Sequence, residues 1–279
     1  MGRISRTLEL AKASWQVLKA DKELLVLPVL SLLATLIVAA SFLAPILMTG
    51  SGTEIEDPGT VGYVLMFVAY VTLAFITIFF NAALVHAANE RLDGGDPTVG
   101  SALRGAAGRV HRILPWALVS ATVSIILRAI EERAGAFGRV VSGIAGIAWS
   151  LVTFLVIPVL VIEDIGVIDA VKRSGSLFKR TWGENMAAQI GFGLLGFVAV
   201  LPAFLLGAGA VAAGGALAFT GLAIAVLWVL AVVMVLSALN GIFQTALYRY
   251  AAGRDTEGAF GGHDLSAAFA PRSRGRGVF

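Results

Sequence analysis

Two adjacent carboxylates, Glu163 and Asp164, stand at the end of a long apolar run, shortly after Pro158. A carboxylate at the end of a membrane-embedded helix can bind a lipid headgroup, a cation or a proton, and a nearby proline frees backbone carbonyl groups to help. Basic residues and one serine follow along the chain: Lys172, Arg173, Ser174, Lys179 and Arg180. This pattern predicts a headgroup or ion-pair site. The alternative is a helix cap, in which Glu163 or Asp164 only pairs with Lys172 or Arg173.

Three amide side chains, Asn81, Asn240 and Gln244, lie inside apolar runs. An amide in hydrocarbon needs a hydrogen-bond partner, and one such bond between helices contributes about 0.6 kcal/mol. Two interpretations therefore stay open. The amides line a polar cavity, or they hold neighbouring helices together.

The sequence offers no recognisable catalytic constellation. The chain has no cysteine and only three histidines, His86, His111 and His263. It contains neither the His-Glu-x-x-His motif of zinc proteases nor a glycine-rich phosphate-binding motif. We therefore expect no enzymatic activity, no bound metal and no cofactor.

The composition indicates the elements that position these residues. Of the 279 residues 58% are hydrophobic and 14% are charged. In soluble domains about 45–50% of the residues are apolar and about 25% are charged, so this composition indicates a membrane protein.

Six apolar runs are long enough to cross about 30 Å of hydrocarbon as helices. They cover residues 24–48, 61–85, 113–130, 140–162, 186–211 and 217–247. The predicted fold is all-α, a bundle of six transmembrane helices that forms one integral membrane domain over residues 1–255, followed by a flexible basic tail over 256–279.

Basic residues predict how the chain sits in the membrane. Of the 21 lysines and arginines, all except Arg128, Arg133 and Arg139 fall on one side of the six runs. Cytoplasmic segments carry the excess of Lys and Arg, so we expect a protein of the cell (inner) membrane with both termini in the cytoplasm. The basic residues are dispersed in clusters between apolar runs, a pattern that argues against nucleic acid as a partner.

The basic connectors suggest an internal repeat. Residues 4–18, 99–110 and 167–178 each place apolar residues at helical spacing beside basic ones, which is typical of an amphipathic helix in the membrane interface. The last two align, with Asp96 on Asp164 and Arg104 on Lys172. The predicted unit is one interfacial helix followed by one transmembrane hairpin, used three times.

Small residues predict close helix contacts. Ser142, Gly146 and Ser150 share one ridge of their run. A second ridge consists of Ala199, Ala203 and Gly207. Such ridges let helix backbones approach in lipid. They could join helices within one chain or between copies in a homo-oligomer or with another membrane protein.

One group of residues resembles a known pattern. Pro158, Glu163, Ala170, the run Lys172-Arg173-Ser174 and Trp182 resemble bacterial and archaeal six-span membrane proteins of unknown function. Those proteins are similar to the membrane domain that accompanies some bacterial glycerophosphodiester phosphodiesterases. The resemblance implies a six-span membrane fold. It implies no activity, because catalysis in those enzymes resides in a separate soluble barrel.

These observations favour a non-enzymatic membrane module that organises lipid or partner proteins, with anionic headgroups at the cytoplasmic face as its ligands. The alternative is a transporter or channel for a small solute or lipid, which the proposed repeat and the three amides would suit.

Overall fold

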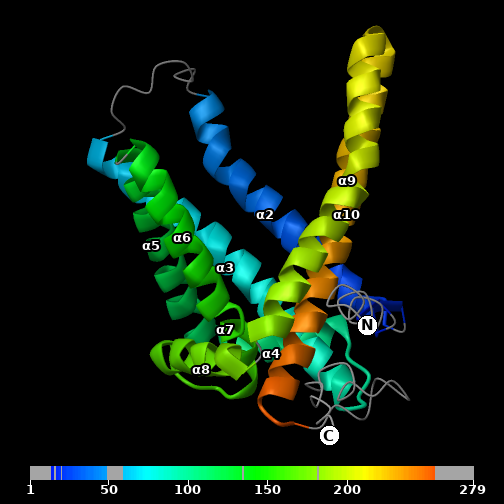
Figure 1. Cartoon of the computed structure of the whole chain (residues 1–279). Helices are drawn as coiled ribbons and strands as arrows, with labels where there is room; N and C mark the ends of the chain where they lie inside the picture. The colour runs from blue at the N-terminus through cyan, green and yellow to red at the C-terminus, as the bar shows by residue number, and fades with distance from the viewer. Residues whose placement is uncertain are drawn as a thin grey trace, which may run out of the picture.

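The computed structural model describes residues 14–15, 17–19, 21–48, 59–133, 135–180 and 182–254, without the side chains of residues 45–48, 136, 180 and 182–190. Most of the interfacial helix predicted over residues 4–18, and the tail predicted over 256–279, lie outside these residues. Within them the regular elements are all helical (Figure 1): α2 (Glu23–Met48), α3 (Gly59–Leu92), α4 (Val99–Gly108), α5 (Val110–Arg133), α6 (Gly135–Thr153), α7 (Val156–Ile162), α8 (Val167–Arg180), α9 (Trp182–Ala213) and α10 (Gly215–Ala251).

Six stretches of helix are long and apolar enough to cross a membrane, so the predicted number of spans is confirmed for the described residues. They are Glu23–Ala44, Gly59–Leu92, Val110–Arg133, Phe137–Ile162, Gly191–Ala213 and Gly215–Ala251. Two of these helices are much longer than a bilayer requires. With 34 residues in α3 and 37 in α10, they measure roughly 50 and 55 Å at about 1.5 Å per residue.

The extra length of α3 and α10 lies at one end of the bundle. This end of the bundle is formed by α4, α7, α8 and the last turns of α3 and α10 (Figure 1), and we call it the polar end. The buried residues of α3 begin at Ala82, and those of α10 begin at Ala238 apart from Ala225. One apolar core cluster draws mainly on these segments, and a second joins the last part of α10 to α5, α7 and α8. Away from the polar end, large apolar side chains such as Phe204 and Phe219 are exposed, as is usual for helices that face lipid.

The fourth span differs from the continuous helix predicted over residues 140–162. It breaks at Phe154–Leu155 into α6 and α7. The Ser174 hydroxyl of α8 donates to the carbonyl oxygen of Val152 at 2.6 Å and accepts from the Leu155 N–H at 3.1 Å. Ser174 is fully buried, so one side chain replaces the helical hydrogen bonds that the break removes.

The second small-residue ridge packs within the chain, where it joins α9 to α10. The Trp228 indole N–H donates to the carbonyl oxygen of Ala199 at 2.8 Å, and Ala203 is buried. A Cβ atom at Gly207 would lie 3.7 Å from the Cβ of Ala225, which is van der Waals contact. This ridge therefore serves the α9–α10 hairpin.

Candidate anion site at the polar end

Asp164 is bound by two arginines of the α4–α5 junction. The Arg109 Nη1 lies 2.8 Å from Asp164 Oδ2, and the Arg112 Nε lies 3.4 Å from Asp164 Oδ1. The Nε of Arg109 also donates to the carbonyl oxygen of Val161 at 3.2 Å. Asp164 adopts a left-handed backbone conformation with φ of 53°, which Asp tolerates better than most residues. This turn ends α7 and aims the carboxylate at the two guanidinium groups.

Glu163 joins α8 and α10 to the end of α7. Its Oε1 accepts from the Arg173 Nε at 3.1 Å and from the Tyr248 hydroxyl at 2.8 Å. The Glu163 side chain is 18% exposed, and Tyr248 is fully buried. The pairing of Glu163 with Arg173 is one that the sequence pattern suggested, whereas Asp164 pairs with arginines from the previous connector.

Arg249 fastens the last turn of α10 to α3. Its Nη1 donates to Asn89 Oδ1 at 3.0 Å and to Asp93 Oδ1. Asn89 in turn donates to Asp93 Oδ2 at 3.1 Å. Arg249 is 6% exposed. Sequence reasoning missed this residue, because it counted Arg249 only as one more basic residue after the last span.

Helix α4 is held against α3 and α2 by polar contacts at its first turn. Thr98 and Ser101 form a capping box, in which each side chain accepts from the other residue's backbone N–H. The Ser101 hydroxyl also donates to Glu90 Oε2 at 2.9 Å, and the Val99 N–H donates to Glu23 Oε2 at 2.8 Å. These contacts fix the position of the rest of α4, which carries Arg104 and Gly105.

A cavity of about 450 Å³ opens between α3, α4, α7 and the residues after α10. We call it the arginine cavity, since three arginines from three segments line it. Its lining consists of His86, Asn89, Arg104, Gly105, Gly108, Arg109, Val161, Ile162 and Arg254. None of these described residues is a carboxylate.

Gly105 sets the width of the arginine cavity. A Cβ atom there would lie 2.3 Å from Cδ2 of His86, so any larger residue would displace the imidazole ring. The glycine therefore lets α4 approach α3 closely and keeps His86 at the cavity wall.

The arginine cavity has the chemistry of an anion site. Guanidinium groups present several N–H donors in a planar array that matches phosphate and carboxylate oxygens. A neutral or protonated imidazole and an amide can add further donors. Among the described residues, no three His, Asp or Glu side chains lie close enough to hold a metal ion.

The remaining predicted site residues are distributed over the molecule. On α8, Lys172 contacts Asp169 at 3.8 Å in an exposed ion pair, and Lys179 is exposed. The Arg180 side chain lies outside the described residues. Asn240 and Gln244 line a second cavity, between α6, α9 and α10, and Asn81 is not among the residues that line it.

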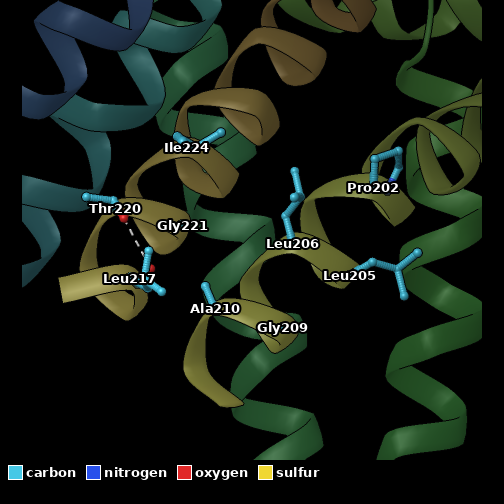
Figure 2. Close-up of a pocket in the computed structure, with 9 residues that line it drawn as sticks. All are labelled: Pro202, Leu205, Leu206, Gly209, Ala210, Leu217, Thr220, Gly221 and Ile224. Carbon is cyan, nitrogen blue, oxygen red and sulfur yellow. Dashed lines mark hydrogen bonds between the residues drawn. The ribbon is translucent and has the colours of Figure 1, made fainter. Parts of the chain in front are cut away.

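A third hollow lies near the opposite end of the α9–α10 hairpin and has no comparable chemistry. Figure 2 shows it between the turns that carry Leu206 and Ala210 and those that carry Thr220 and Ile224. Thr220 contributes its one side-chain hydroxyl, which donates to the carbonyl oxygen of Leu217 at 3.2 Å. The rest of the lining is apolar or glycine, as suits a surface in contact with lipid.

Comparison with known proteins identifies a family and no activity. No curated protein matches the chain. Residues 60–259 match the family described as "Family of unknown function (DUF6159)". This match covers α4 to α10 and all of α3 except its first residue, and it includes every residue that lines the arginine cavity. The chain therefore belongs to the DUF6159 family, with the six long apolar helices of a multi-span membrane protein.

Proposed function

We propose that this protein is a non-enzymatic membrane module that binds the phosphate of an anionic lipid headgroup in the arginine cavity. The observation that carries the proposal is the convergence of Arg104, Arg109 and Arg254 from three segments on one cavity whose described lining holds no carboxylate. A binding role is favoured over catalysis because the described lining offers His86 as its one possible general base and no hydroxyl or carboxylate that could act as a nucleophile or as a second acid–base group.

The surrounding ion pairs support a specific cavity rather than a diffuse basic collar. Arg173 forms an ion pair with Glu163, and Arg249 forms one with Asp93. These two arginines therefore hold helices together and do not contribute to the cavity. Arg109 shares its charge with Asp164. Arg104 and Arg254 are exposed and supply the cavity with positive charge.

The location of the polar end fits this ligand. We propose that it faces the cytoplasm, with α4 and α8 in the membrane interface as parts of a repeated unit. Anionic lipids of the inner leaflet attract juxtamembrane basic residues by about 1 kcal/mol each. The resemblance to the membrane domain of some glycerophosphodiester phosphodiesterases also suits a protein that works beside phospholipid headgroups.

The test is lipid retention by the purified full-length protein, measured by native mass spectrometry after exchange into phosphatidylglycerol, phosphatidylcholine or inorganic phosphate. We expect phosphatidylglycerol to remain bound to the wild type and the double variant Arg104→Gln/Arg254→Gln to lose at least tenfold in occupancy. The matched control is Arg128→Gln/Arg133→Gln, which removes two exposed arginines at the other end. Equal retention by all three proteins would overturn the proposal.

Further arms separate the possible sources of binding. Inorganic phosphate that binds as tightly as phosphatidylglycerol would make the ligand a free anion rather than a lipid. The variant Lys172→Gln/Lys179→Gln removes two exposed lysines of α8. If this variant loses as much lipid as Arg104→Gln/Arg254→Gln does, lipid binds to a diffuse basic surface and not to the arginine cavity.

The orientation can be tested separately because the chain has no native cysteine. Ser176, on α8, and Ala212, near the end of α9, are both exposed. A membrane-impermeant maleimide should label Ala212→Cys in intact cells and Ser176→Cys only after lysis. The reverse pattern would place the polar end outside the cell.

A further inference from the structure

The second cavity lies where the α9–α10 hairpin meets the broken fourth span. It measures about 600 Å³ and is lined by Ser150, Phe154, Phe192, Val233, Leu236, Ser237, Asn240 and Gln244. Four of these side chains are uncharged and polar, two are aromatic and two are aliphatic. We call it the amide cavity. Away from the polar end, α9 and α10 lean away from α5 and α6 (Figure 1), so the amide cavity lies where these two hairpins begin to diverge.

Gln244 is the unusual member of the lining. It is 7% exposed, and its Oε1 is buried with no hydrogen-bond partner among the described residues. An unpaired buried amide oxygen destabilises the folded state, because it has given up its hydrogen bonds to water. Hydrogen bonds between helices do not explain the burial of this oxygen, since no described residue donates to it. A ligand in the cavity would explain it.

The lining defines the chemistry of that ligand. It has no charged side chain among the described residues, which disfavours a phosphate or an ammonium group. The aromatic and aliphatic residues suit a hydrocarbon chain. A hydroxyl both donates and accepts, so it pairs with the Gln244 amide in either orientation of the oxygen and nitrogen.

We infer that the amide cavity binds an uncharged lipid alcohol, with the hydroxyl at Gln244 and Asn240 and the chain against Phe154 and Phe192. The volume falls within the range of about 300–1,000 Å³ that is typical of small-molecule sites. The α6–α7 break contributes to the site directly, because Phe154 belongs to it. This site goes beyond the anion site and shares no lining residue with it.

The experiment measures binding of dioleoylglycerol to the full-length protein in phosphatidylcholine nanodiscs, with 3-O-methyl dioleoylglycerol as the matched probe without a hydroxyl. We expect the alcohol to bind at least tenfold more tightly than the ether. The variant Gln244→Leu should lose this preference. Equal affinity of the wild type for alcohol and ether, or an unchanged preference in Gln244→Leu, would overturn the inference.

The chain offers a close control for Gln244→Leu. Asn81 Oδ1 is also buried without a partner among the described residues, yet Asn81 does not line the amide cavity. Asn81→Leu should keep the preference for the alcohol, and a loss of this preference in Asn81→Leu would also overturn the inference.

Ser237 is exposed at the cavity. The variant Ser237→Phe should therefore block binding of both probes while the residue at position 244 stays a glutamine. If Ser237→Phe binds normally, the probe sits elsewhere.

Discussion

The Tyr248 hydroxyl donates a hydrogen bond to Glu163 Oε1 at 2.8 Å, across 85 residues of sequence. The same oxygen accepts from Arg173. One carboxylate therefore holds the end of α7, the middle of α8 and the last turns of α10 together. These elements form one wall of the polar end, so the stability of the wall depends on this carboxylate.

Tyr248→Phe should lower the free energy of unfolding by about 1.5–3 kcal/mol, the usual contribution of a hydrogen bond to a charged group. The phenyl ring keeps the packing of this fully buried side chain. The decrease in the free energy of unfolding therefore measures the contribution of the hydroxyl alone. Unfolding in mixed micelles, followed by circular dichroism, measures it. Tyr70→Phe is the control, since Tyr70 is exposed, and it should change stability little.

A double-mutant cycle with Arg173→Gln tests the shared oxygen. Tyr248 and Arg173 bind the same atom, so their effects should not add. Removal of the second partner should cost more than removal of the first, because Glu163 is then left with neither partner. Strictly additive effects would contradict a common site.

Ser174→Ala should be strongly destabilising for one serine. The hydroxyl pairs both Val152 O and Leu155 N at the α6–α7 break, and each unpaired buried group costs about 1–3 kcal/mol. Ser176 is the matched control: it lies on the same helix, is exposed, and donates only to Arg173 O within its own helix. Thermal unfolding should separate the two alanine variants clearly. Equal melting temperatures would mean that α6 and α7 rejoin into one helix when the serine is absent.

The sequence predicts the spans well, because an apolar run of about 20 residues reports helix length directly. The contacts at the polar end are harder to predict. Arg249 meets Asn89 across 160 residues, and hydropathy patterns carry no information on which connector lies beside which. The break at Phe154–Leu155 was missed for a similar reason, since its hydrogen-bond partner is Ser174 in the next helix. The Lys172-Arg173-Ser174 motif was the sequence feature that could have indicated these contacts. Arg173 binds Glu163, and Ser174 pairs with the backbone at the α6–α7 break.

Gly241→Ala should destabilise the contact between α3 and α10. A Cβ at position 241 would lie 2.4 Å from Cδ2 of Leu84, and Leu84 is itself buried, so it cannot move into open space. Overpacking of this kind costs about 1–3 kcal/mol. Gly143→Ala is the control within another helix, α6, where a Cβ would meet nothing within 4 Å. There the substitution should add about 0.5–1 kcal/mol of stability. A gain of stability in both variants, measured by unfolding in mixed micelles, would show that helix propensity rather than packing decides.

Asp21→Asn should stabilise the protein at neutral pH. Asp21 is buried just before α2, and its Oδ2 has no partner among the described residues. Burial raises the pKa of this carboxyl above its ordinary 3.8, the charges of Glu23 and Asp96 add to the increase, and Arg91 and a backbone hydrogen bond at Glu23 oppose it. The folded state thus binds the proton more tightly than the unfolded state, so stability falls as the pH rises through the raised pKa.

Asparagine keeps the oxygen that accepts from the backbone and removes the charge. The melting temperature of Asp21→Asn should therefore exceed that of the wild type at pH 7, and the difference should shrink as the pH falls toward 4. Glu132→Gln, at an exposed carboxylate near the other end, should show no such trend. A difference that stays constant from pH 4 to pH 7 would mean that the gain comes from packing or capping. A destabilised variant at pH 7 would mean that the attraction of Arg91 outweighs the cost of burial.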